Sequence, residues 1–228
     1  TLFPYTTLFR SIIPLLNKLG QFLGNPMLRN IFNQHENKID LEQLMNQKKI
    51  VLINLARGKI GEENASLLGG LFLAKVKRAG MARANLSSKE RAECYLYMDE
   101  FQQVITDNFE SLLSESRKYG INMTIAHQYI GQLSKKIQNA VLGNAGSIIC
   151  FRVSGEDAAT LRPEFAPVFD IKDMINLGIG EFYIKMTIDG QSYDPFSAET
   201  LKVLPAPYPS SKAAVVDASR KQFAVHLS

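Results

Sequence analysis

The chain has 228 residues, 46% of them apolar, which is enough to bury one substantial core. Its net charge of +4, from 26 basic and 22 acidic residues, permits nucleic-acid binding without demonstrating it. No apolar run reaches about eighteen residues, so no segment is expected to span a membrane. Cys94 and Cys150 lie in or beside apolar runs and are expected to be reduced core residues, with neither a disulfide nor a metal site.

The first eleven residues have a character that the rest of the chain does not continue. Residues 1–11 resemble the in-frame translation of a common short-read sequencing adapter, and we exclude them from fold reasoning. On this interpretation the gene continues upstream, and removing Arg10 lowers the net charge from +4 to +3. An ordinary amphipathic amino terminus is the alternative.

From residue 12 the pattern predicts helices around one early strand. The apolar run 50–55 is typical of a strand buried on both faces, and small residues in the long helix after it indicate close packing. In chain order, the expected elements are helices at 12–23 and 27–32, a capped turn at 40–45, a strand at 50–55 and a helix at 62–83. Six basic residues cluster in and after this helix, where a solvated face is more usual than a polyanion site: Lys75, Lys77, Arg78, Arg83, Lys89 and Arg91.

The rest of the chain alternates strands with helices. We expect strands at 95–98, 123–126 and 147–153, and helices at 108–119, near 130–142 and at 156–162. This rhythm predicts an α/β fold with a mostly parallel sheet, right-handed crossovers and helices on both faces. Asp189-Gly190, between 182–188 and 191–197, predicts a hairpin that ends the sheet with an antiparallel edge. Prolines after residue 204 predict that 205–228 is a linker or disordered tail, with a weak helix at 215–225.

Two adjacent acids follow the apolar strand at 95–98. Asp99 and Glu100 would lie at the carboxyl end of that strand, where open α/β sheets bind ligands. Gln128 ends the next apolar strand and should leave the same edge of the sheet, and Arg117 lies between the two strands at the end of a helix. Each residue also has an ordinary interpretation, since acids and glutamine cap helices and arginine interacts with a helix carboxyl end. His127 is interpreted as a packing or hydrogen-bonding residue.

Three segments together resemble a known family. They are Tyr97-Met98-Asp99-Glu100-Phe101, Ser116-Arg117-Lys118-Tyr119-Gly120 and Ala126-His127-Gln128, in this order and spacing. The trio resembles the carboxyl-terminal half of the motor domain of type IV secretion coupling proteins, relatives of the HerA and FtsK DNA pumps. The resemblance runs from about residue 25 to 204, and it implies a partial RecA-like P-loop NTPase domain at 12–204 that is incomplete at its amino terminus.

The resemblance also implies a role for each residue of the trio. Asp99 would hold Mg²⁺ through water, Glu100 would polarise the attacking water and Gln128 would sense the γ-phosphate of ATP. Arg117 would act as an arginine finger in the site of a neighbouring subunit. The implied assembly is a homo-hexamer that moves DNA and works with other secretion-system proteins, with no small-molecule substrate besides ATP. The implied location is cytoplasmic, at the inner face of the membrane through an amino-terminal anchor.

The sequence contains no Gly-x-x-x-x-Gly-Lys-Ser/Thr loop, so the chain as given is expected to be inactive alone. The leading hypothesis is therefore a fragment of an ATP-driven DNA translocase. A non-hydrolysing module that binds partners on a RecA-like fold is the alternative. A ring ATPase that acts on protein is a third hypothesis, which these motifs do not separate from the first.

Overall fold

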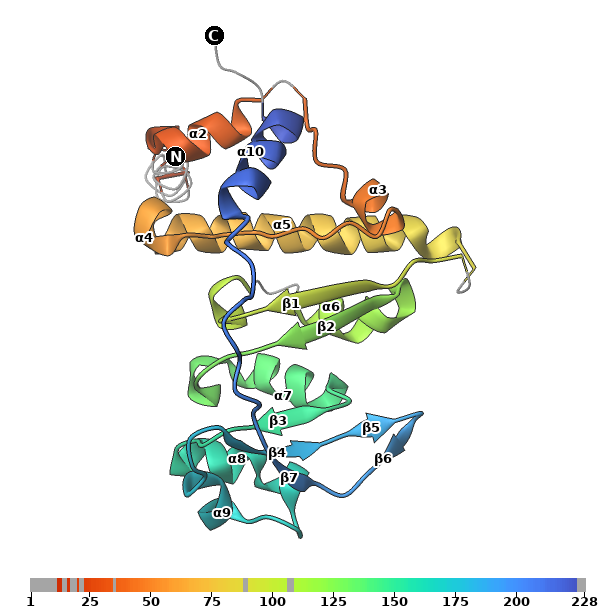
Figure 1. Ribbon diagram of the computed structural model, residues 1–228, viewed down its shortest axis with the longest axis vertical. Helices are drawn as coiled ribbons and strands as arrows, with labels where there is room; N and C mark the ends of the chain where they lie inside the picture. The colour runs from red at the N-terminus through yellow and green to blue at the C-terminus, as the bar shows by residue number, and fades with distance from the viewer. Residues whose placement is uncertain are drawn as a thin grey trace, which may run out of the picture. The chain divides into compact units, whose positions relative to one another are not determined.

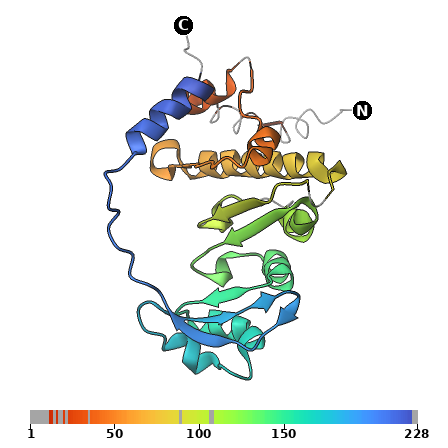
Figure 2. The same cartoon turned by 45° about the vertical axis from the view of Figure 1, so that its right-hand side comes forward.

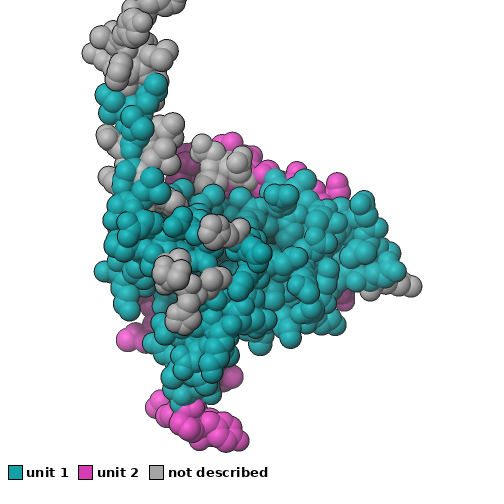
Figure 3. Space-filling model, turned by 90° about the horizontal axis from the view of Figure 1, so that it is seen from above, with its two compact units in different colours: residues 1–94, 103–105, 210–228 teal, residues 95–102, 106–209 magenta. Residues whose placement is uncertain are grey.

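The computed structural model describes residues 12–13, 16, 20, 23–34, 36–87, 90–105 and 109–224. The adapter-like segment 1–11 therefore lies outside the described residues, as does part of the helix expected at 12–23. The chain divides into two compact units, which Figure 3 colours separately. Unit 1 comprises Thr1–Cys94, Gln103–Ile105 and Ser210–Ser228, and unit 2 comprises Tyr95–Gln102 and Thr106–Pro209.

Unit 1 is built from helices. Its elements are α2 (Pro26–Phe32), α3 (Leu41–Asn46), α4 (Arg57–Ile60), α5 (Glu62–Ala82), the 3₁₀ turn η1 (Arg83–Asn85) and α10 (Lys212–Phe223) (Figure 1). Side-chain caps mark the first residues of α2 and α3. Oδ1 of Asn25 accepts a hydrogen bond from the N–H of Met27 at 2.9 Å, and Oδ1 of Asp40 accepts one from the N–H of Gln43 at 3.1 Å. These helices, the long helix α5 and a helix within the tail were all predicted.

The strand predicted at 50–55 is wrong, because these residues have no strand assignment. Figures 1 and 2 draw the segment as coil running alongside α5, and the side chains of Ile50 and Leu52 are 90% and 81% exposed. A strand requires backbone hydrogen bonds from a neighbouring strand, which an apolar run by itself does not supply. α4 was also not predicted.

Helix α5 buries a narrow stripe along its length. Five buried positions recur at intervals of three or four residues, as one helix face requires: Ala65, Gly69, Leu73, Val76 and Gly80. Gly70 and Ala79 are buried beside them. At Gly69 an added Cβ would lie 2.7 Å from Cβ of Val104 and 3.1 Å from Cδ1 of Leu55. A side chain at position 69 would therefore displace Val104 or Leu55, which agrees with the close packing that the small residues of this helix indicated.

The basic cluster after α5 is partly structural. The side chain of Arg83 is fully buried and its Nη1 donates to the carbonyl of Ala92 at 2.7 Å. Arg91 donates from Nε to the carbonyl of Arg83 at 3.1 Å and from Nη2 to that of Leu86 at 2.9 Å. Both guanidinium groups thus satisfy carbonyls where the helix ends, which weakens the case that the cluster as a whole contacts phosphates.

Unit 2 contains the strands and further helices. Strand β1 (Cys94–Met98) is followed by η2 (Phe101–Gln103), α6 (Phe109–Glu115), η3 (Ser116–Tyr119), β2 (Ile121–Ile125), η4 (Ile130–Gln132), α7 (Lys135–Asn144), β3 (Ile148–Cys150), α8 (Gly155–Phe165), α9 (Ile171–Ile175), β4 (Glu181–Lys185), β5 (Thr187–Ile188), β6 (Gln191–Ser192) and β7 (Phe196–Glu199). The strands predicted at 95–98, 123–126 and 147–153 exist with shifted ends, whereas the two predicted at 182–188 and 191–197 are each divided into two shorter strands. α9 was not predicted.

The strands form three small sheets in the described part of the chain. β1 pairs with β2, β3–β4–β7 form a second sheet and β5–β6 a third. Figure 1 draws the arrows of β1 and β2 in the same direction, whereas the β3–β4, β4–β7 and β5–β6 pairs are antiparallel. The hairpin is confirmed, with Ile188 opposite Gln191 and positive φ angles of 50° and 80° at Asp189 and Gly190, as a tight hairpin turn requires. The RecA-like assignment remains a prediction.

An apolar cluster of unit 2 lies around β3 and α8. Its buried members are Ile130, Cys150, Ala158, Leu161, Phe165 and Met174. The rings of Phe169 and Tyr183 stack beside it with centroids 3.7 Å apart. Cys94 and Cys150 are free thiols, and of the two only Cys150 is buried, whereas Cys94 is half-buried. Among the described helices, none is both long and apolar enough to cross a bilayer.

Candidate active site at the ends of β1 and β2

Backbone hydrogen bonds hold the ends of β1 and β2 together. The N–H of Ala126 donates to the carbonyl of Met98 at 2.9 Å, and the N–H of Phe101 donates to the carbonyl of Ala126 at 3.1 Å. The residues that follow each strand, Asp99-Glu100 and His127-Gln128, therefore emerge side by side. The sequence had placed these residues at one edge for the same reason, since neighbouring parallel strands end together.

The carboxylate of Glu100 lies between two glutamine amides. Nε2 of Gln128 donates to Oε1 at 2.5 Å, and Nε2 of Gln102 donates to Oε2 at 2.6 Å. Hydrogen bonds to an ionised acceptor are short and about twice as strong as neutral ones. The structure thus brings together two predicted residues, Glu100 and Gln128, and adds a third.

Glu100 has an uncommon backbone conformation. Its φ of 50° lies in the left-handed region, which costs a residue other than glycine about 1–2 kcal/mol. The preceding side chain supports the turn, because Oδ1 of Asp99 accepts from the N–H of Glu100 at 3.0 Å. This turn directs the carboxylate toward Gln102 and Gln128.

Asp99 is exposed and is the residue best suited to a metal. Mg²⁺ usually binds proteins through one or two carboxylates and takes its other ligands from water and phosphate oxygens. A single carboxylate at the strand end fits that requirement, with Oδ1 oriented by the backbone of Glu100. In the described part of the chain, no three His, Cys, Asp or Glu residues gather as a complete metal cage.

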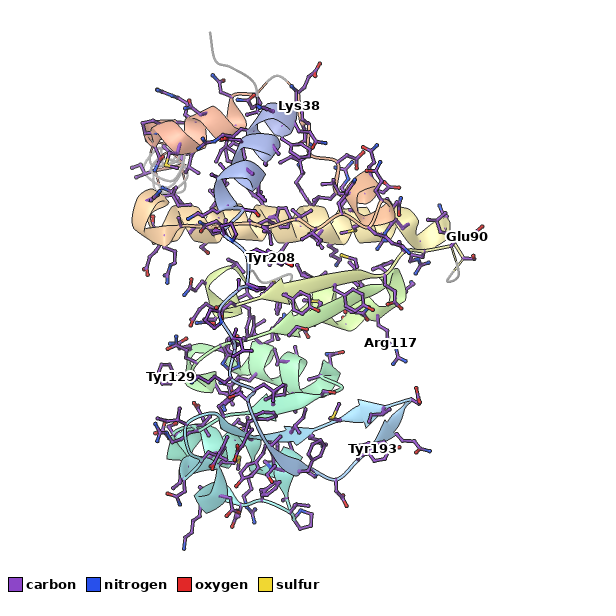
Figure 4. All side chains as sticks on the ribbon, viewed as in Figure 1. Lys38, Glu90, Arg117, Tyr129, Tyr193 and Tyr208 are labelled. Carbon is purple, nitrogen blue, oxygen red and sulfur yellow. The ribbon has the colours of Figure 1, made fainter. Side chains whose placement is uncertain are left out.

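Arg117 lies at the other end of the strand pair. It is an exposed residue of η3, which precedes β2, whereas Gln128 follows β2. Figure 4 shows the Arg117 side chain pointing away from the strands on one side of unit 2, with Tyr129, the neighbour of Gln128, on the opposite side. Within this chain, therefore, Arg117 does not join Asp99, Glu100 and Gln128.

Packed aromatic side chains support the two loops that follow β1 and β2. Phe101 is fully buried, stacks on Phe109 with ring centroids 5.5 Å apart and meets the imidazole of His127 edge-on at 5.3 Å. Burial lowers the pKa of His127, and the nearby carboxylates of Asp157 and Glu100 partly oppose this shift. The packing interpretation of His127 agrees with this geometry.

Sequence reasoning missed Gln102. Its amide is half-buried, and among the described residues its Oε1 has no hydrogen-bond partner, which costs about 1–3 kcal/mol for a buried acceptor. The available signal was weak, because a glutamine two residues after Glu100 faces it only if the chain makes a tight turn there. η2 is that turn.

A comparison with models of protein families gives a match. Residues 93–163 match a family model described as the TraM recognition site of TraD and TraG, and no curated protein matches the chain. The matched segment covers about a third of the chain and contains all four predicted site residues. This match supports the interpretation that the chain contains part of the carboxyl-terminal region of a conjugative coupling protein, as the resemblance of the three motifs had implied.

Proposed function

We propose that this chain is part of the coupling ATPase of a conjugation or type IV secretion system. Asp99, Glu100 and Gln128 would form the water-activating part of its ATP site. The observation that carries this proposal is the hydrogen bond from Gln128 to Glu100, which joins two strand ends inside the matched segment. A carboxylate beside a polar amide at one sheet edge is suited to orienting water near a phosphate.

In this site each residue has a separate task. Asp99 would hold Mg²⁺ through water, and the metal would neutralise charge on the ATP phosphates. Glu100 would accept a hydrogen bond from the attacking water, and Gln128 would exchange its contact with Glu100 for one with the γ-phosphate. The loop that cradles the phosphates would be supplied by a part of the gene upstream of this sequence.

The whole assembly is also a proposal. A RecA-like core in a homo-hexamer would allow Arg117, on the far side of its own strand pair, to act in the site of a neighbouring subunit. Such a ring would move DNA through its centre by sequence-independent phosphate contacts. Among the described members of the basic cluster, Lys75 and Arg78 are exposed and could contact phosphates.

Glu100→Gln in the protein encoded by the intact gene is the direct test of the ATP site. We expect ATP binding to be retained and steady-state hydrolysis to fall by a factor of about a hundred or more, because the substituted amide cannot take up the proton of water. Gln132→Met, at an exposed residue of the turn η4, is the control and should hydrolyse normally. A Glu100→Gln protein that kept most of its turnover would remove Glu100 from this role.

The description of the matched family favours a second candidate, recognition of a TraM-type partner without hydrolysis. The exposed face of β1 offers Tyr95 and Tyr97, which are 60% and 71% exposed. Titration of this chain against a TraM-type protein from the same system should show saturable binding that Tyr97→Ser weakens and Gln132→Met does not. If the chain binds the TraM-type protein and the protein encoded by the intact gene does not hydrolyse ATP, the result would favour the partner-binding module over the coupling ATPase.

A further inference from the structure

We propose that Gln102 is a positioning residue for Glu100, the fixed member of a pair of amides of which Gln128 is the exchangeable member. This inference rests on the proposed ATP site and deepens it. Gln102 donates to Oε2 at 2.6 Å and Gln128 to Oε1 at 2.5 Å, so each amide holds a different oxygen of one carboxylate. The two hydrogen bonds, one to each oxygen, therefore fix the orientation of the carboxylate plane.

The two amides differ in how firmly they are held. Gln102 lies in η2, the short turn that directly follows Glu100, and is itself half-buried next to Phe101, whose side chain is fully buried. Gln128 comes from the other strand, 28 residues away, and is exposed. An exposed side chain can leave a hydrogen bond for a ligand, whereas a half-buried one beside a packed ring moves less readily.

The orientation of the Gln102 amide supports its assignment. Its Oε1 is buried and has no hydrogen-bond partner in the part of the chain that the structure describes, whereas its Nε2 reaches Glu100. Rotating the amide by 180° would place Oε1 against the carboxylate, so that two acceptors would face each other. The amide therefore has one useful orientation, with its donor on Glu100.

The division of tasks follows from this asymmetry. When a phosphate oxygen of ATP attracts the amide of Gln128, the attacking water would take the place of Gln128 as a donor to Oε1 of Glu100. Gln102 meanwhile keeps Oε2 in place, so that the carboxylate does not rotate. Misplacing a catalytic base by about 1 Å can lower the reaction rate about a hundredfold. Holding the carboxylate of Glu100 in place should therefore preserve the rate of hydrolysis.

Side-chain amide resonances of the isotopically labelled chain test the contact directly. In the unmodified chain the Gln102 amide protons should resonate downfield of an exposed glutamine such as Gln132. Glu100→Gln should move them upfield, and Gln128→Met should leave them in place. Gln102 resonances at the position of an exposed amide, or unmoved by Glu100→Gln, would overturn the proposal without relying on any variant of Gln102.

Kinetics of the protein encoded by the intact gene test the consequence. Gln102→Met should lower kcat for ATP hydrolysis at least tenfold with KM changed less than twofold, whereas Gln132→Met should change neither. A normal kcat in Gln102→Met would overturn the positioning role even if the amide contact exists. Absence of hydrolysis in the unmodified protein would instead count against the proposed ATP site, and the resonances would still decide the contact.

Discussion

At the scale of single residues, Glu100 combines backbone strain with a strongly bonded side chain. Its φ of 50° is unfavourable for any residue with a Cβ, yet this conformation is what brings its carboxylate to Gln102 and Gln128. Strain of this kind persists where the surrounding contacts over-determine the geometry, and it concentrates at functional sites. The backbone and the side chain of Glu100 thus make opposite contributions to stability.

Substitution of Glu100 should separate these contributions. Glu100→Gly should be more stable to urea than Glu100→Ala by about 1 kcal/mol, because only the alanine variant retains the left-handed strain. At Lys75, an exposed position inside α5, the order should reverse by about 1 kcal/mol, since glycine destabilises a helix interior. Equal stability of the two Glu100 variants would mean that the turn relaxes when the carboxylate is removed.

The lowered pKa of His127 predicts a pH dependence. Because burial favours the neutral imidazole in the folded state, the unfolded chain takes up a proton first as pH falls below about 6.5. This contribution to stability is therefore complete above that pH and is lost as pH falls through the folded-state pKa. The Cε1 proton of His127 should titrate below the usual histidine range, and His127→Gln should flatten the dependence of stability on pH between 7 and 5.

At the scale of elements, α5 shows how a helix can depend on a missing side chain. Gly69 lies against Val104 and Leu55, and its neighbours on the same face are buried. The glycine of α7 at position 143 has no atom within 4 Å of where a Cβ would lie, although it too is helical. Helix propensity favours alanine at both sites, but packing space exists at only one of them.

Two glycine substitutions therefore make a matched pair. Gly69→Ala should destabilise unit 1 by about 1–3 kcal/mol through overpacking, whereas Gly143→Ala should stabilise the chain by up to about 1 kcal/mol. Urea unfolding followed by circular dichroism measures both. A stabilising Gly69→Ala would show that Val104 and Leu55 can move aside without cost.

At the scale of the whole molecule, the chain after β7 is nearly independent of the strands that precede it. Residues 201–210 are exposed throughout, with Leu201 and Val203 more than 90% exposed, and α10 buries none of its residues. The predicted tail at 205–228 therefore includes a helix, but one with no fully buried residue. Little of the folding free energy of unit 2 should depend on it.

Truncation after Leu204 tests that independence. Hydrogen exchange of the amides in α8 and β4 should change by less than about 0.5 kcal/mol in opening free energy, because the removed residues bury no apolar side chain there. Phe165→Ala, within the core around α8, should by contrast cost about 3–5 kcal/mol. A large loss of protection after truncation would show that the tail supports unit 2.

The sequence by itself determined most of the helices, the hairpin and the polar residues that meet at the two strand ends. These depend on local signals: caps at Asn25 and Asp40, the turn at Asp189-Gly190 and the polar residues that directly follow apolar strands. Only the tertiary structure decided that 50–55 forms no strand, because pairing depends on a neighbour. It also decided that Arg83 is buried and that Gln102 holds Glu100, since burial and the direction of a tight turn arise from contacts that no sequence period encodes.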